Sequence, residues 1–424
     1  MDSERVLDNQ TLVVRDGRIV AVGPASSVAV PANARVIEGS GKYLMPGLAD
    51  MHAHLPPFPG DAGDAADIQM QLYLANGVTT VRGMMGHPAH LTLRDRITRG
   101  ERTGPAIVAG SPPVHGKNAP DPAAADKMIT DLKSQGFDLV KVWEGLSPDS
   151  YATITSTARR IAIPIAGHVT ATVGLERALA ARQSSIEHLD GYLQALVPVD
   201  APVQPPPGQL VLGPVQKHID ESRMRGLAQA TKAAGVYNTP TLALFRIVMS
   251  EDPVDAFLKW PEMRYVSPGA QKQFAAQKAG TYDIPAPAAE RERYLELRDR
   301  MARTLAENGA PLLIGPDSPQ MFLVPGFATH REIRSFRAAG ISSFAALSAA
   351  TRNAAAYLGK EAEFGTVATG KRADLLLLDG NPLADLGNLD TRAGVMVRGA
   401  WLPAADLRRM LDGIAALHAS SSSK

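Results

Sequence analysis

The sequence predicts an α/β protein in which a (β/α)8 TIM barrel is joined to one small β-sandwich domain built from both chain ends. Three observations support this fold. From residue 43 to about 358, short apolar runs typical of strands alternate with longer amphipathic or alanine-rich stretches. Strand-like runs without intervening helices flank this region on both sides. The chain of 424 residues is long enough for a large barrel and a smaller module. We therefore assign residues 1–45 and 361–424 to the sandwich and 46–360 to the barrel.

The N-terminal segment has the pattern of a small β module. Asp16-Gly17 separates the apolar runs 11–15 and 18–23, and an Asp-Gly turn in that position is a strong hairpin signal. Residues 35–38 are predicted to form a further strand. Such a module is too small to bury a core alone. It needs the strand-like runs near the C-terminus as its other half.

Eight strand candidates occupy the central region. They are residues 44–51, 78–82, 106–109, 139–142, 163–168, 185–188, 237–241 and 312–314. Predicted helices lie between them, and several end at Gly or Asn as helix C-caps do. Strand and helix in alternation predict a parallel sheet, and eight such units close into a barrel. The alternative is an open doubly wound sheet, against which counts the absence of a glycine-rich phosphate loop.

Two stretches interrupt the alternation. Residues 198–214 contain six prolines and must form a loop. Residues 245–290 are long and irregular. On a barrel, such insertions commonly lie over the C-terminal face and shape the pocket, and the alternative is a surface flap without function. Beyond the barrel, apolar runs at 365–367, 373–378 and 394–398 return to strand character, and the serine-rich residues 419–424 are expected to be disordered.

Histidines stand at the ends of several predicted strands. His52 and His54 end the first strand, and their i, i+2 spacing places both side chains on one face. His168 and His188 end two later strands, and Asp317 follows the last. A single one would more often be structural. The C-termini of parallel barrel strands share one rim, however, so five such residues predict a metal site there. The chain has no cysteine, which excludes thiolate ligands, cysteine nucleophiles and disulfides.

Lys141, near the end of the strand 139–142, leaves two interpretations open. An ammonium group in a metal site is unfavourable unless its charge changes. A carbamate formed with carbon dioxide would make the side chain an anionic ligand able to bridge two metals. The alternative is an ordinary lysine whose chain extends to the rim. The residue and its position alone do not choose between them.

Together these features resemble the amidohydrolase superfamily, in particular its binuclear, carboxylated-lysine members and its imidazolonepropionase-like and Xaa-Pro dipeptidase-like hydrolases. The resemblance spans nearly the whole chain. It rests on the His-Ala-His motif that follows Pro46-Gly47-Leu48, on the strand-end residues named above, and on the segments 77–82, 350–355 and 370–382.

The resemblance implies a set of six metal ligands. His52, His54 and Asp317 would hold one divalent ion, His168 and His188 the other, and carboxylated Lys141 would bridge them together with a hydroxide. Zinc is the expected metal. The hydroxide would attack an amide or peptide bond of a dipeptide or N-acyl amino acid, and Asp317 would carry the proton to the leaving amine.

The sequence departs from this family pattern in three places. Gly83 follows Arg82, where many relatives carry an aspartate. The interval from Lys141 to His168 is shorter than in many relatives. The first strand of the N-terminal module is short or missing. None of these departures alters a predicted ligand, although the first bears on the pocket.

Substrate contacts are predicted from four further residues. Tyr192, just after His188, is a candidate hydrogen-bond donor to the oxyanion, with a packed rim tyrosine as the alternative. His115 lies in the loop after the third strand and is a candidate catalytic or substrate contact. Arg82 and Arg246 are candidates for bidentate binding of a substrate carboxylate, with ordinary surface arginines as the alternative.

The sequence is also compatible with other functions. The same site would hydrolyse a lactone, cyclic amide or phosphotriester. A non-catalytic barrel acting as a binding or assembly module is the alternative of another class, against which the intact ligand set counts. A formal net charge of +1 implies no field that would attract nucleic acid or a membrane, so neither is expected as a partner. The expected partner is a small-molecule substrate. Relatives suggest a homo-oligomer. The polar start predicts no signal peptide and hence a soluble, cytoplasmic chain, or a periplasmic or secreted one if a leader was removed.

Overall fold

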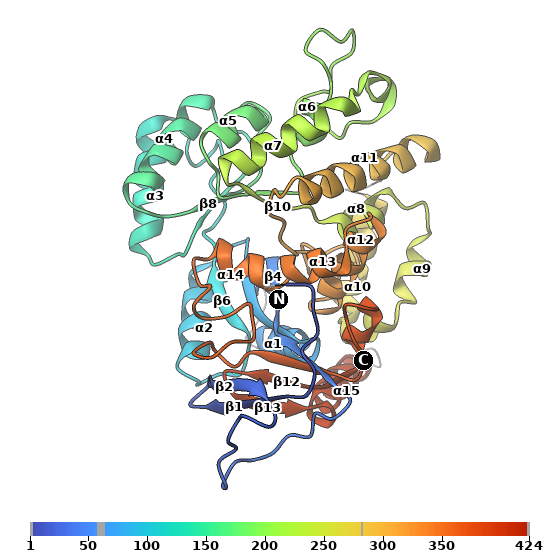
Figure 1. Cartoon of the computed structure of the whole chain (residues 1–424). Coiled ribbons are helices and arrows are strands. Elements are labelled where there is room, and N and C mark those ends of the chain that lie inside the picture. Colours follow the sequence, from blue (N-terminus) through green and yellow to red (C-terminus); the bar gives the residue numbers. More distant parts are fainter. Residues whose placement is uncertain (1–2, 57–63, 281–282, 422–424) are drawn as a thin grey trace.

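Two parallel sheets form the centre of the computed structural model, which describes residues 3–56, 64–280 and 283–421 (Figure 1). The first has the order β4-β5-β6 and the second β10-β9-β8-β7. Their strands are β4 (Leu48–Ala53), β5 (Val78–Gly83), β6 (Ala106–Ala109), β7 (Val140–Val142), β8 (Ile165–Gly167), β9 (Ser185–Glu187) and β10 (Tyr237–Thr239).

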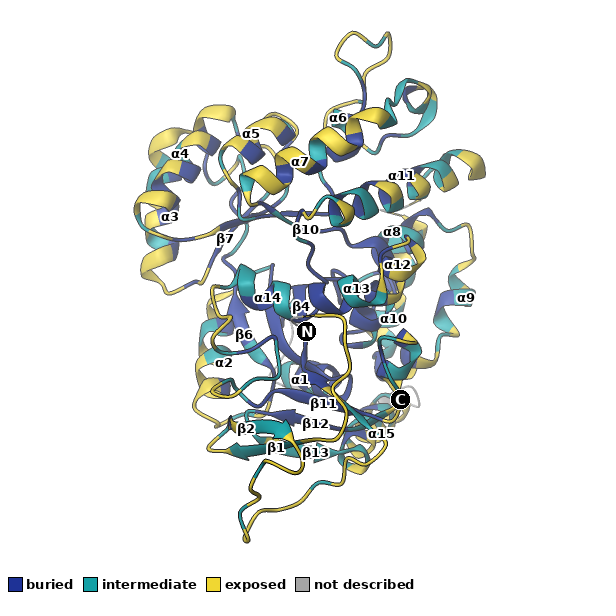
Figure 2. Cartoon of the chain, viewed as in Figure 1, coloured by how far each residue is buried: buried dark blue, intermediate teal, exposed yellow. Residues whose placement is uncertain are grey.

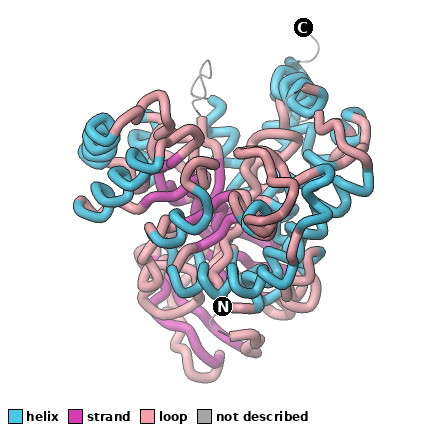
Figure 3. Tube along the Cα trace, turned by 90° about the horizontal axis from the view of Figure 1, so that it is seen from above, coloured by secondary structure: helices cyan, strands magenta, loops and turns pink. Residues whose placement is uncertain are grey.

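Single parallel bridges connect these two sheets. Gly110 pairs with Leu139 between β6 and β7. The segment 312–318 pairs with β10 through Leu312 and Asn238, and with β4 through Ser318 and Ala53. The strand order therefore runs around a ring, although its strands are divided between two sheets and the segment 312–318 forms bridges only. Figure 3 shows strands gathered at the centre with helices around them.

Helices cover the outside of the parallel sheets. They include α1 (Asp64–Ala75), α2 (Pro88–Thr98), α3 (Pro122–Ser134), α4 (Pro148–Arg160), α5 (Gly174–Ala180), α7 (Met224–Ala234), α11 (Ala288–Glu307) and α12 (Phe327–Ala338). In α3, Ala125, Ile129 and Leu132 form one buried stripe at helical spacing. Asp121 caps this helix by accepting a hydrogen bond from the Ala124 amide. Figure 2 shows the resulting pattern, with buried strands inside and exposed outer helix faces.

A second, antiparallel layer lies at the base of the molecule in Figure 1. Its four-stranded sheet has the order β13-β12-β11-β3, with strands β3 (Tyr43–Pro46), β11 (Leu375–Leu378), β12 (Arg392–Val397) and β13 (Ala400–Pro403). The hairpin β1 (Gln10–Arg15) and β2 (Arg18–Pro24) packs on it over a small core of Ile19, Ala373, Leu375 and Met396. Strands from both ends of the chain therefore build this layer. The final helix α15 (Ala404–Ser421) packs against α1.

Several predicted elements differ in the structure. The predicted strand 44–51 is two strands, because Gly47 separates β3 in the antiparallel sheet from β4 in the parallel one. A Cβ at Gly47 would lie 2.2 Å from Thr79 Oγ1, so only glycine fits at this crossing. The predicted strands at 35–38 and 365–367 are loop.

The stretch 245–290 is not irregular throughout. It holds the end of α8 (Leu242–Met249), α9 (Val254–Leu258), η3 (Pro261–Tyr265), α10 (Pro268–Ala279) and the first turn of α11. Prolines start several of these helices, α9 and η3 have five residues each, and α10 buries only Phe274, so none shows a clear helical period. The proline-rich stretch 198–214 is loop up to η1 (Gly213–His218), as predicted, and projects beyond α6 (Tyr192–Ala195) in Figure 1.

The chain ends differ in part from expectation. The expected disordered tail is helical as far as Ser421, and the rest of it lies outside the described residues. The first two residues, which entered the prediction about a signal peptide, also lie outside them. Among the described residues, no helix is long and apolar enough to cross a membrane.

Candidate metal centre

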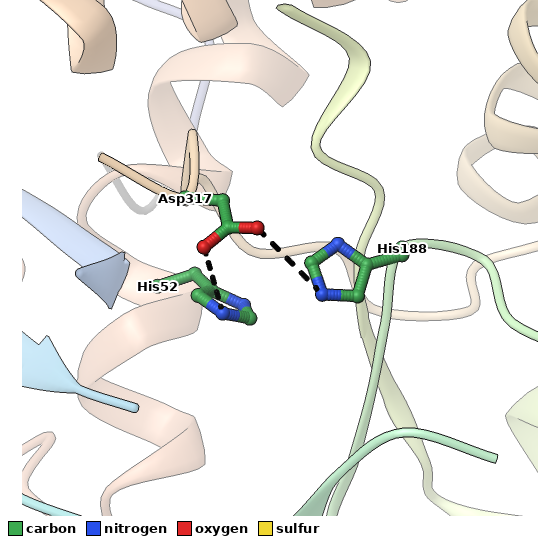
Figure 4. Close-up of side chains that lie close together, drawn as sticks. All are labelled: His52, His188 and Asp317. Carbon is green, nitrogen blue, oxygen red and sulfur yellow. Dashed lines mark ion pairs between the residues drawn. The ribbon is translucent and has the colours of Figure 1, made fainter. Parts of the chain in front are cut away.

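Histidines and an aspartate converge where the parallel strands end. His52 lies on β4, His188 directly follows β9, and Asp317 lies in the bridged segment 312–318 (Figure 4). The Oδ1 atom of Asp317 is 3.3 Å from His52 Nε2 and 3.0 Å from His54 Nε2. Its Oδ2 atom is 3.9 Å from His188 Nε2. Residues remote in sequence therefore present nitrogen and oxygen donors to one another.

His168 and Lys141 extend this cluster. The His168 ring stacks on His188 with 4.8 Å between centroids, and the His52 and His188 rings are also 4.8 Å apart. Lys141 is buried on β7, and its Nζ is 5.6 Å from the ring of Trp143, which in turn is 4.9 Å from the His168 ring. The structure thus brings all six predicted ligand residues into one neighbourhood.

The backbone turns sharply where these side chains are presented. His188 has a φ of 61°, Thr241 of 50° and Asp317 of 67°. Non-glycine residues adopt this left-handed region at a cost of about 1 to 3 kcal/mol each. Such strain accumulates at sites whose side-chain directions matter more than local stability.

Hydrogen bonds on Nδ1 determine which imidazole nitrogen faces the cluster. His52 Nδ1 is 2.7 Å from a Glu187 oxygen, and His168 Nδ1 is 2.8 Å from an Asp190 oxygen. Because an ionised carboxylate only accepts, Nδ1 carries a proton in both rings, and Nε2 is the nitrogen left to face the cluster.

His188 reaches the same tautomer through a neutral partner. Its Nδ1 is 2.9 Å from the Thr241 hydroxyl, which donates its own proton to the Pro240 carbonyl at 2.8 Å. The hydroxyl must therefore accept from His188. The lone pair of His188 Nε2 consequently faces Asp317.

Burial sets the charge state of the donors. It lowers the pKa of His52 to about 4 and that of His188 well below its ordinary value, so both imidazoles are neutral at pH 7. Burial alone would raise the pKa of Asp317, but positive charge on His52 and His54 lowers that pKa well below its usual range, so a proton taken up by this cluster binds an imidazole rather than the carboxylate. Burial lowers the pKa of Lys141, which favours its neutral amine.

These donors fit a divalent metal ion. Imidazole lone pairs and a carboxylate that face one another repel unless a cation lies between them. Among the described residues, the buried Oδ1 of Asp317 is one of the side-chain oxygens without a hydrogen-bond partner. Two groups place their ligand atoms within 4.8 Å of each other: His52, His188 and Asp317, and Glu144, His168 and Asp190. Nitrogen and oxygen ligands of this kind suit zinc and similar ions.

Three of the predicted substrate contacts lie elsewhere. Arg82 is fully buried and donates to Met51, Ser185, Glu187 and Thr239, so it has no free face for a substrate. Arg246 pairs with Asp299 of α11 at 2.8 Å.

Tyr192 is also buried away from any substrate. Its hydroxyl lies between Thr231 of α7, at 2.8 Å, and the side-chain amide of Asn238, at 3.0 Å. Both partners belong to the packing between β10 and its covering helix, so the phenol has no free hydrogen for an oxyanion.

His115 stays compatible with a role at the rim. Its loop is tied to the strand that carries Lys141, because Val114 bridges to Val142 and accepts from the Trp143 amide. The side chain is half-buried, and its Nδ1 accepts a hydrogen bond from the Lys117 amide. This leaves Nε2 for another partner, and the predicted substrate contact remains a prediction.

The sequence reasoning missed the residues that orient the histidines. Glu187 immediately precedes His188, and Asp190 follows it by two positions. Acidic residues next to strand-end histidines are a readable signal for such partners. Thr241 and Trp143 offer no comparable signal beyond their positions just after strands.

One family model and two curated relatives are similar to this chain. The model of the Amidohydrolase family matches residues 43–402. An imidazolonepropionase of Mycolicibacterium smegmatis is 35% identical over 96 residues, which cover 22% of this chain and 24% of that protein. An imidazolonepropionase of Symbiobacterium thermophilum is 23% identical over 398 residues, which cover 89% of this chain and 85% of that protein. The chain thus spans about a quarter of the first relative and most of the second.

Solved structures share the fold. A bottromycin amidohydrolase superposes with a TM-score of 0.71 and 24% identity, covering 96% of this chain and 86% of that one. A putative prolidase from Bifidobacterium longum gives 0.69 and 25%, covering 96% and 93%. A Xaa-Pro dipeptidase with bound methionine in its active site gives 0.67 and 18%, covering 95% and 97%. Together with the family match over residues 43–402, these structures confirm the resemblance to the amidohydrolase superfamily, whereas the binuclear, carboxylated-lysine type remains a prediction.

Proposed function

Because this chain belongs to the amidohydrolase family, we propose that it is a metal-dependent hydrolase of amide bonds whose substrates are dipeptides or N-acyl amino acids. The family match supports chemistry at carbon–nitrogen bonds. The prolidase and dipeptidase among the similar structures support the substrate class. The single observation that carries the proposal is the convergence of the His52, His54 and His188 imidazoles on the ionised Asp317 at the strand ends.

The proposed centre uses the six predicted ligands. His52, His54 and Asp317 would hold one divalent ion, most simply zinc, and His168 and His188 a second, with Lys141 carboxylated between them. The lowered pKa of Lys141 supports this modification, because the neutral amine attacks carbon dioxide, forms a nitrogen–carbon bond and releases a proton to solvent. When bound, such a metal pair lowers the pKa of water and polarises a carbonyl.

The chain's own groups move the proton and hold the substrate. Asp317 is ionised and buried beside the histidines, so its carboxylate can accept a proton and return it to the amine nitrogen as the carbon–nitrogen bond breaks. Trp143, packed on His168, supplies an apolar wall, and His115 lies on the adjacent loop as a substrate contact. Exclusion of water by such an apolar wall strengthens the electrostatic interactions within the site.

A substrate screen with zinc-loaded protein tests the proposal. Xaa-Pro dipeptides, other dipeptides and N-acyl amino acids are compared with lactones, cyclic amides and phosphotriesters under the same conditions. We expect turnover of the first group, lost when zinc is chelated and restored when it is returned. Faster turnover of a lactone or phosphotriester would show that the proposed substrate class is wrong. No turnover of any compound, together with less than one bound zinc ion per chain, would refute the proposed metal centre.

We also propose that the two parallel sheets and the segment 312–318 form one closed eight-stranded barrel, with domain boundaries at residues 45/46 and 360/361. The bridges at both ends of the sheets support closure. A homo-oligomer is proposed from the family resemblance, and light scattering on the purified chain tests it.

A further inference from the structure

A buried ion pair lies beside the metal cluster without belonging to it. We propose that Glu187, held by Arg82, is a positioning residue that fixes the tautomer and direction of His52 and thereby sets how tightly the centre binds its metal. This inference rests on the proposed metal centre but not on the proposed substrate.

Glu187 uses both of its carboxylate oxygens. Its Oε2 is 2.7 Å from His52 Nδ1. Its Oε1 accepts from Arg82 Nη2 at 2.8 Å and from the Ser185 hydroxyl at 2.5 Å. The side chains of His52 and Glu187 are 1% and 0% exposed, so water cannot replace the carboxylate as acceptor. The bond crosses from β9 to β4 and joins two of the strands that carry ligands.

Arg82 keeps this carboxylate charged and in place. Its guanidinium group also donates to the Met51 carbonyl at 2.5 Å and to Ser185 Oγ at 2.8 Å, and lies 4.8 Å from the ring of Tyr357 in α14 (Arg352–Tyr357). A buried carboxylate is stable in ionised form only when it is paired and hydrogen-bonded. A charged acceptor in turn makes the imidazole a more basic metal ligand.

The other two histidine partners lack this arrangement. Asp190, the partner of His168, has a side chain that is 25% exposed, so solvent shares its charge. Thr241, the partner of His188, is neutral. Among the described residues, His52 is therefore the imidazole whose acceptor has a buried cation of its own. Loss of the Glu187 charge should weaken this ligand most.

Zinc affinity distinguishes positioning from a merely structural role. Glu187→Gln is compared with Glu262→Gln, which alters another buried arginine-paired glutamate: Glu262 accepts from Arg331 at 2.7 Å and contacts no histidine. In a titration against a competing chelator, we expect zinc binding to weaken about 10- to 100-fold in Glu187→Gln. The control should stay within about twofold of wild type.

A second variant and a second measurement keep the test informative if Glu187→Gln does not fold. Glu187→Gln leaves Arg82 buried without its counter-charge, so the double variant Arg82→Met/Glu187→Gln removes both charges and is titrated in parallel. Metal-free wild type with nitrogen-15-labelled histidine is also studied by NMR, with His52→Asn assigning the signal. We expect a protected proton on His52 Nδ1, absent in folded Glu187→Gln and present in Glu262→Gln.

Two results would overturn the inference. One is unchanged zinc affinity in folded Glu187→Gln, and the other is a proton on Nε2 of His52 in metal-free wild type. If neither variant folds, the wild-type spectrum decides alone. A wild type that binds no zinc would remove the proposed function, whereas the tautomer is measured without metal and reports separately on Glu187.

Discussion

Substitution of Gly315 by alanine should disturb His52 through backbone packing alone. Gly315 lies in the segment that carries Asp317, beside β4. A Cβ built on it would lie 2.5 Å from the His52 backbone nitrogen and 2.7 Å from His52 Cβ and from Thr239 Cγ2. Two of these atoms belong to the part of His52 that β4 holds in place, since Met51 donates to the Ile314 carbonyl on the same edge. No flexible side-chain end can yield, so the strand itself must shift.

The magnitude follows from overpacking. One extra carbon in a tightly packed interior lowers the free energy of unfolding by about 1 to 3 kcal/mol. With an unfolding entropy of about 2.1 cal/mol/K per residue, a chain of this length loses roughly 1 °C of melting temperature per kcal/mol. We therefore expect Gly315→Ala to melt about 1 to 3 °C lower in calorimetry, and to bind zinc more weakly because His52 is displaced.

The matched control is the same change in open space. Gly226 lies in α7, and an added Cβ there meets nothing within 4 Å. Gly226 is the third residue of α7, so alanine there should add at most the roughly 0.5 to 1 kcal/mol of a helix interior, and Gly226→Ala should melt no lower than wild type with unchanged zinc affinity. Equal melting temperatures and zinc affinities for the two variants would refute the close packing of segment 312–318 on His52.

Three further predictions concern charge and metal. Lys141→Ala should remain folded by circular dichroism and bind fewer zinc ions by elemental analysis. Its turnover should fall at least about 100-fold and be partly restored by acetate or propionate, whereas full turnover would exclude a carbamate ligand. Asp317→Asn should lower kcat by about 10² to 10⁴, measured on the substrate found by the screen, and a small effect would assign the proton to another group. Burial raises the pKa of Glu332 from 4.5 to about 7, so its folded form binds more protons than the unfolded chain and stability should fall as pH rises from about 4.5 to 7, by roughly 3 kcal/mol. Melting curves across this pH range should be flatter for Glu332→Gln than for wild type, and parallel curves would show that Glu332 is not the group responsible.

The convergence of the candidate ligand residues was predictable because their signal is local. His52 and His54 share a strand face by spacing alone, and the common rim of parallel strands brings distant strand ends together. The buried ion pair of Arg82 could not be predicted in this way. Alternation places it on a buried face, but its partner Glu187 lies on another strand, and only the arrangement of the strands in space shows that the two meet.

Tyr192 illustrates a different limit. It follows His188 closely, yet a glycine with left-handed backbone at Gly191 starts α6 and turns the phenol outward to Thr231. Residue spacing predicts direction only along a regular strand. The helices α9 and α10 were missed for other reasons, since α9 has only five residues and α10 buries only Phe274, so neither shows an apolar face at helical spacing.

The single glycine between β3 and β4 has a consequence for the order in which the protein is made. β3 pairs with β11, so Met45 lies beside Leu376 in the antiparallel sheet, and β4 with His52 begins two residues after β3 ends. A ribosome therefore releases His52 early, but the sheet that anchors the preceding strand is complete only when residues 375–403 emerge. Asp317 and the pairing of segment 312–318 with β4 also come late. The candidate ligands can therefore come together only after residues 312–318 have been synthesised, and β3 finds its partner strand later still.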